Sequence, residues 1–187
     1  MTESKREKFL RKIMQVIFVV YILLLMRFIL FKYVPLTSPW DAFFLRKREY
    51  NIIPLKATFQ MIRGLSPLRL VENIAGNIIL FVPFGILLPL AFRVERLTIL
   101  YGFAASVFVE IIQLAFAMGA ADIDDVILNT LGAVIGYVAY RIINRCIKNR
   151  EKMLTVMAVL LSAGLVAGVI ILYFAGYLID GFPNIIF

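Results

Sequence analysis

The chain contains no histidine and a single cysteine, Cys146, among its 187 residues. Without histidine it lacks the side chain that most often serves as a base near neutral pH and most often binds metal ions. One cysteine cannot form a disulfide within the chain or supply a cysteine metal cluster. Any acid–base chemistry would therefore depend on carboxylates, lysine or tyrosine.

Charged residues are also few, at 17%, whereas hydrophobic residues make up 62% of the chain and the mean hydropathy is +0.91. Soluble domains average about 45–50% apolar residues, so this composition is typical of an integral membrane protein. A net charge of +8 could indicate nucleic-acid binding. Here, however, the basic residues flank apolar runs, where they attract anionic lipid headgroups, and we expect no nucleic-acid partner.

Five apolar runs are long enough to cross a bilayer, which takes about 20 residues per helix. They extend over residues 13–31, 74–92, 98–121, 126–143 and 153–179. The proline-containing segment 35–73 is too polar to span throughout and has room for short interfacial helices. The sequence therefore predicts an all-α, integral membrane helical bundle of about five transmembrane helices, folded as one domain over residues 1–187.

The distribution of basic residues predicts the orientation of the bundle. With the N-terminus inside, twelve Lys and Arg residues lie in cytoplasmic segments and seven lie on the opposite side. The positive-inside rule places the basic excess in the cytoplasm. We therefore expect a multi-pass protein of the plasma membrane that is N-in and C-out, with the 35–73 loop extracellular.

Glu110 is the only charged residue in the third apolar run. A charged carboxylate at the centre of a membrane helix costs about 2.5–3.5 kcal/mol, so it is rarely present without a partner or a task. Ser106 and Gln113 lie four residues before it and three after it, which places all three side chains on one helix face. We expect this polar face to point toward other helices.

The fourth run has a face of polar and small residues with helical spacing, namely Asp122, Asp125, Asn129, Gly132 and Gly136. Gly132 and Gly136 form a GxxxG pair, which allows close approach of another helix. Acids at a helix start also cap free N–H groups, and this interpretation suffices for Asp122, Asp125 and the intervening Asp124.

The second run has Asn77 near its outer end and contains Phe81-Val-Pro-Phe-Gly85. Pro83 has no N–H, so the carbonyl of Ile79 needs another partner. A kinked packing helix and a binding site are both consistent with this pattern.

Polar groups on three different runs share one depth. With a rise of about 1.5 Å per residue, Asn77, Glu110 and Asn129 each lie roughly 5–13 Å below the outer boundary. Several polar residues at one depth suggest a pocket or a shared network. We expect Glu110 to hydrogen-bond Asn77, Gln113 or Asn129. The basic residues 46–48, followed by Asn51, would place cations above the acidic residues at 122–125.

Three runs resemble the motif blocks of the VanZ-like membrane protein family and occur in the same order: Asn77-Ile-Ile-Leu-Phe-Val-Pro-Phe-Gly85, Ser106-Val-Phe-Val-Glu-Ile-Ile-Gln113 and Asp122-Ile-Asp-Asp-Val-Ile-Leu-Asn-Thr-Leu-Gly132. Residues 48–55 are similar to the block that precedes them in the family, and the resemblance covers about residues 46–140. Members often carry Gly-Arg before the third block, where this chain has Met118-Gly-Ala-Ala. The resemblance implies a multi-pass protein whose namesake confers low-level resistance to the lipoglycopeptide teicoplanin.

Two functions of different classes are consistent with these patterns. In the first, a non-enzymatic protein binds a lipid or lipid-linked anion in an outer-leaflet cleft and alters how a lipoglycopeptide meets the cell envelope. Arg48 would hold the anion. The cleft would be shaped by Asn51, Asn77, Glu110, Gln113, Asp122, Asp125 and Asn129, with structural support from Phe81, Pro83, Gly85, Ser106, Gly132 and Gly136.

In the second, a membrane hydrolase or transferase acts on a lipid-linked envelope precursor. Glu110 and Asp125 are the catalytic candidates, with Glu110 as the general base. Asp122, Asp124 and Asp125 could hold Mg²⁺ or Ca²⁺, which bind carboxylate oxygens. No nucleophile motif accompanies them, and the first function needs no cofactor. A proton-coupled carrier is a third interpretation, suggested by Glu110 alone.

Overall fold

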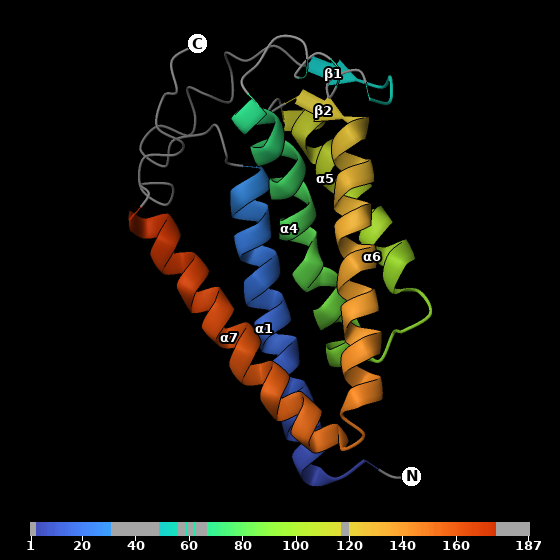
Figure 1. Cartoon of the computed structure of the whole chain (residues 1–187), viewed down its shortest axis with the longest axis vertical. Coiled ribbons are helices and arrows are strands. Elements are labelled where there is room, and N and C mark those ends of the chain that lie inside the picture. Colours follow the sequence, from blue (N-terminus) through green and yellow to red (C-terminus); the bar gives the residue numbers. More distant parts are fainter. Residues whose placement is uncertain are drawn as a thin grey trace.

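The computed structural model of the chain describes residues 3–30, 49–55, 59, 62, 67–116 and 120–174. Its helices are α1 (Lys5–Leu30), α4 (Pro67–Phe92), α5 (Thr98–Phe116), α6 (Ile123–Cys146) and α7 (Arg150–Phe174), and its strands are β1 (Glu49–Asn51) and β2 (Ala120–Asp122). Figure 1 shows a bundle of helices, with α7 diverging from the others toward its C-terminal end. In this described part of the chain five helices are long and apolar enough to cross a membrane, which confirms the predicted helical membrane bundle.

The outer faces of the helices are apolar. Large side chains such as Leu23 (66% exposed), Ile79 (65%) and Leu160 (61%) project away from the bundle. A surface of this kind is unfavourable in water but suits contact with acyl chains. Helices suit such surroundings because each satisfies its own backbone hydrogen bonds where no water is available.

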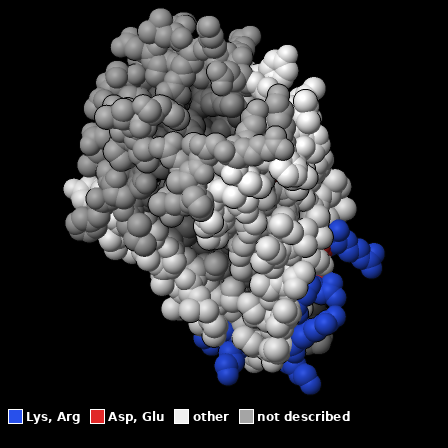
Figure 2. Space-filling model, turned by 45° about the horizontal axis from the view of Figure 1, so that its top comes forward, with Lys and Arg blue, Asp and Glu red and all other residues white. Residues whose placement is uncertain are grey.

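The described Lys and Arg side chains visible in Figure 2 gather at one end of the molecule. This end contains the N-terminus, the α4–α5 connection and the α6–α7 connection. Exposed basic residues in these segments include Lys5, Arg6, Lys8, Arg93, Arg96, Arg145, Lys148 and Lys152. Basic residues that the sequence analysis assigned to the cytoplasm thus lie at one end of the described bundle.

Several helix boundaries differ from the sequence-based expectation by three residues or more. Helix α1 begins at Lys5 instead of residue 13, and α4 begins at Pro67 instead of residue 74. Both helices extend beyond their apolar runs, and a search for apolar runs does not detect their polar first turns. Helix α5 ends at Phe116, five residues before the predicted end, because residues 120–122 form a strand.

That strand belongs to a small parallel sheet that the sequence analysis did not predict. Strand β1 pairs with β2 in the register Glu49 to Ala120, Tyr50 to Ala121 and Asn51 to Asp122. The sheet lies at the end of the bundle opposite the N-terminus, above the first turn of α6 (Figure 1). It joins part of the 35–73 loop to the α5–α6 connection.

Helices α4 and α6 approach each other closely through glycine. A Cβ atom added at Gly132 would lie 2.2 Å from the carbonyl oxygen of Ile78, and one added at Gly136 would lie 2.0 Å from that of Val82. Gly85 on α4 meets the Ala133 carbonyl oxygen in the same way, at 2.1 Å. These distances confirm the predicted role of the GxxxG pair, since only glycine lets the two backbones come this near.

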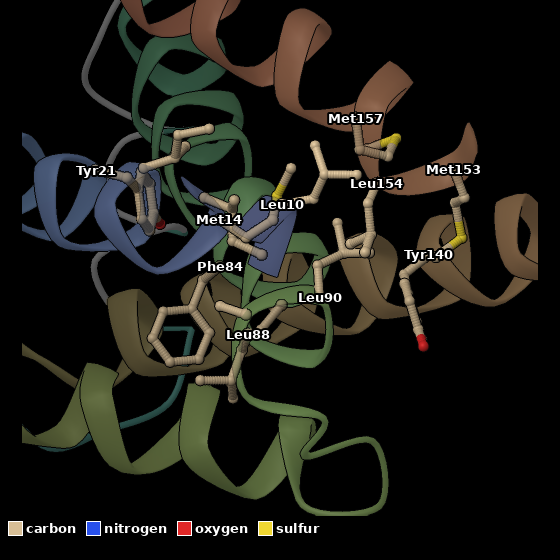
Figure 3. Packing of buried hydrophobic residues seen from close by; sticks show 14 of the residues in the cluster. Leu10, Met14, Tyr21, Phe84, Leu88, Leu90, Tyr140, Met153, Leu154 and Met157 are labelled. Carbon is tan, nitrogen blue, oxygen red and sulfur yellow. The ribbon is translucent and has the colours of Figure 1, made fainter. Parts of the chain in front are cut away.

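The apolar core joins α1, α4, α6 and α7. Figure 3 shows Met14 of α1, Leu90 of α4, Tyr140 of α6 and Leu154 of α7 within one packed cluster. Helix α1 also donates two side-chain hydrogen bonds to carbonyls of α4. The Tyr21 hydroxyl bonds Leu80 at 2.7 Å and the Gln15 amide bonds Ala91 at 3.2 Å. This core holds α4 and α6 rigidly below the sheet.

Candidate functional site

Polar side chains gather at the end of the bundle that carries the sheet. We use the name polar cluster for Asn51, Asn77, Ser106, Glu110, Gln113, Asp122, Asp124, Asp125 and Asn129. They come from β1, α4, α5, and the β2–α6 junction with α6. All but Ser106 and Asp124 were expected from the sequence to shape the cleft, and hydrogen bonds link most of them in the structure.

The α5 face behaves as predicted. Ser106, Glu110 and Gln113 are all buried, with Glu110 only 7% exposed. One carboxylate oxygen of Glu110 accepts a hydrogen bond from the backbone N–H of Asp122 at 2.8 Å. The prediction that Glu110 lies inside the bundle is confirmed, but its predicted partner was wrong. A backbone group of the α5–α6 connection takes the place of the three expected side chains.

Two further buried side chains of the polar cluster, the amides of Asn129 and Gln113, each donate one hydrogen bond. The Asn129 amide donates to the Ser106 hydroxyl at 2.9 Å, which links α6 to α5. The Gln113 amide donates to the carbonyl of Ile29 at 3.2 Å, which links α5 to the end of α1. The amide oxygens of Asn129 and Gln113 are buried, and no donor of the described residues lies within hydrogen-bonding distance of them. Buried acceptors of this kind are uncommon, since most buried polar atoms have a partner.

Asp122 caps helix α6, as the sequence suggested. Its backbone is extended, and its side chain accepts from the N–H of Asp124 at 2.9 Å. The same side chain accepts from the Asn51 amide of β1 at 3.0 Å. Asp122 thus serves as a cap and as an anchor for the strand.

The next two acids bind different parts of the chain. Asp124, 4% exposed, accepts a short hydrogen bond from the backbone N–H of Leu55. Asp125 accepts from the Asn77 amide of α4 at 2.6 Å. The three Asp side chains therefore point to three different partners. Among the described residues no group of three His, Cys, Asp or Glu side chains is arranged to hold a metal ion.

The remaining predicted residues divide into two groups. Phe81 is fully buried and Pro83 is partly buried in α4, and the three motif glycines are in the α4–α6 contact. Arg48 and the neighbouring Arg46 and Lys47 lie outside the described residues. Their predicted anion contact stays a prediction.

Leu55 is a member of the site that the sequence reasoning missed. Its φ of 62° is in the left-handed region, which L-residues other than Gly, Asn and Asp seldom adopt. The hydrogen bond to Asp124 holds this conformation. The only sequence signal was Pro54, since a proline often accompanies a turn.

A bundle of five apolar helices with an internal polar cluster at one end defines a polytopic helical membrane protein. Within that class, residues 18–144 match the VanZ/LLP1 family model, and the chain belongs to this family. It is also 34% identical over 120 residues to Protein VanZ of Enterococcus faecium, a match that covers 62% of this chain and 73% of that protein. No solved structure matches the chain.

Asn51→Ala should release the strand without unfolding the bundle. The substitution removes the bond to Asp122, and one such bond contributes about 0.5–1.5 kcal/mol. Hydrogen–deuterium exchange in residues 49–55 and 120–122 should therefore accelerate by up to about tenfold. Asn144→Ala makes the same chemical change toward the other end of α6 and should leave this exchange unchanged. Equal exchange in both variants would mean that Asn51 does not hold the strand.

Proposed function

We propose that this VanZ/LLP1-family protein binds a lipid or lipid-linked anion at the outer leaflet of the plasma membrane and lowers susceptibility to teicoplanin-type lipoglycopeptides. The family match over residues 18–144 and the similarity to VanZ support the link to glycopeptide resistance. The excess of basic residues in the segments on the N-terminal side of the bundle, twelve against seven on the opposite side, supports a cytoplasmic N-terminus and an outward-facing polar cluster.

The observation that carries the binding proposal is the set of bonds made by the carboxylates. Glu110, Asp122, Asp124 and Asp125 each accept a hydrogen bond from a protein donor. Side chains used in this way position the strand and the first turn of α6, and they are not arranged as an acid–base pair around a substrate. Binding by a positioned loop therefore fits the cluster better than catalysis.

In this proposed function, Arg48 binds the anion. This residue directly precedes β1, and β1 is held by its pairing with β2 and by the Asn51–Asp122 bond. A guanidinium binds phosphate or carboxylate through two parallel hydrogen bonds, which a lysine cannot do.

Expression of the chain in a teicoplanin-susceptible bacterium tests the proposal. We expect a raised inhibitory concentration for teicoplanin and little change for a glycopeptide without an acyl chain. Arg48→Ala should remove most of this effect, because a hydrogen bond to a charged group contributes about 1.5–3 kcal/mol, or tenfold or more in affinity. Lys148→Ala, a loss of charge at the opposite end, should keep it.

Lipid analysis of the purified protein is the complementary measurement. An anionic lipid or lipid-linked precursor should copurify with the wild type and be depleted from Arg48→Ala. If no anionic lipid is enriched and Arg48→Ala retains full resistance, the binding proposal is wrong.

A further inference from the structure

The segment that follows β1 has an unusual surface. Tyr50, Ile52, Ile53 and Leu55 are 69%, 75%, 56% and 51% exposed. No charged residue interrupts them, since the segment reads Tyr-Asn-Ile-Ile-Pro-Leu. Four large apolar side chains thus project from six consecutive residues.

Three backbone groups of the same segment are paired within the protein. The N–H of Ile53 donates to the Asn51 side chain at 3.3 Å, and the N–H of Leu55 donates to Asp124. Pro54 has no N–H, and the Leu55 carbonyl accepts from Phe59 at 2.9 Å. Each backbone group that is paired in this way lowers the free-energy cost of moving the segment out of water.

The segment also lies at the level where the spanning helices end. Leu55 bonds Asp124 in the first turn of α6, and α6 is itself long and apolar enough to span the membrane. One turn deeper on α6, Ile127 is 45% exposed and belongs to the apolar outer face of the bundle. Residues 50–55 are therefore joined, through Leu55, to the end of α6 at which this lipid-facing surface begins.

We propose that Tyr50, Ile52, Ile53 and Leu55 form an interfacial anchor that inserts into the acyl region of the adjoining leaflet, and that the polar cluster beneath holds it in place. The occupant of this surface is bilayer lipid. Tyrosine suits such a position, because aromatic rings with one polar end are enriched at membrane interfaces. The anchor would tether the strand pair to the membrane surface.

This inference is independent of the teicoplanin proposal, because its test needs neither antibiotic nor ligand. The full chain with Cys146→Ser receives one new cysteine at a time, at Ile53 or at Ile52, labelled with an environment-sensitive fluorophore. Each protein is placed in vesicles of phosphatidylcholine and phosphatidylglycerol in equal amounts. Quenching is compared between spin-labelled lipid and aqueous iodide.

Two further positions calibrate the measurement. Ile79, on the outer face of α4, reports lipid contact, and Lys148, in the basic α6–α7 connection, reports contact with water. We expect the probes at Ile52 and Ile53 to emit at shorter wavelength than at Lys148. They should be quenched several-fold more by spin-labelled lipid than by iodide.

Either of two results would overturn the proposal. Quenching by iodide alone would mean that the segment lies in water. Shielding from both quenchers would mean that protein, such as a second copy of the chain, covers it. Asn51→Ala in the Ile53 probe background should weaken lipid quenching, whereas Asn144→Ala should not. Equal quenching in these two variants would mean that the polar cluster does not hold the anchor in place.

Discussion

Gly136→Ala should lower the free energy of unfolding of the bundle by about 1–3 kcal/mol, the usual effect of overpacking. The added methyl group would lie 2.0 Å from the carbonyl oxygen of Val82, a backbone atom that cannot turn aside. Helices α4 and α6 would have to move apart along their shared face. Unfolding by dodecyl sulfate in mixed micelles, followed by circular dichroism, measures the loss.

The matched control is Gly164→Ala in α7. A Cβ added there meets nothing within 4 Å, so the variant should be neutral or slightly more stable, because alanine favours helix by up to about 1 kcal/mol. The prediction is thus that one of two identical substitutions in membrane helices destabilises the protein and the other does not. Equal stability of the two variants would contradict the close α4–α6 contact.

Glu110→Gln should preserve both folding and the resistance phenotype. The amide oxygen of glutamine still accepts from the N–H of Asp122, so the hydrogen bond that Glu110 makes is retained. Glutamine cannot act as a base, however. If Glu110 were the general base of a hydrolase or transferase, activity would fall by about 10²–10⁴-fold in a protein that still folds. A folded but inactive variant would therefore favour the enzyme interpretation.

Glu110→Leu is the companion variant. Leucine has a similar volume but offers no acceptor, so the N–H of Asp122 would lose its partner at a cost of about 1–3 kcal/mol. Stability should fall, and exchange in residues 120–122 should accelerate. Wild-type stability and phenotype in both variants would make Glu110 incidental to either function.

Features with a local period could be predicted from the sequence. The spacing of Ser106, Glu110 and Gln113 determines that they share a face whatever surrounds the helix, and all three are buried. Gly132 and Gly136 are likewise one turn apart, and the contact with α4 follows from their size. The carboxylate of Asp122 caps α6 because its N–H partner is two residues away.

Features that depend on distant residues could not be predicted. Asn51 and Asp122 are 71 residues apart, and no periodicity connects the two short strands that carry them. The partner of Glu110 was missed for a related reason. A search for side chains of matching depth does not consider backbone N–H groups, yet a chain that leaves a helix presents such donors at its next turn.

The pairing of β1 with β2 also constrains the order in which the parts of the protein assemble during synthesis. Strand β1 leaves the ribosome before α4 and α5, whereas its partner follows them, at residues 120–122. Strand β1 therefore stays unpaired until α4 and α5 have been inserted and the chain has returned to the same side of the membrane. Closure of the sheet is then a late step of biogenesis, and it occurs only in chains whose α4 and α5 have inserted correctly.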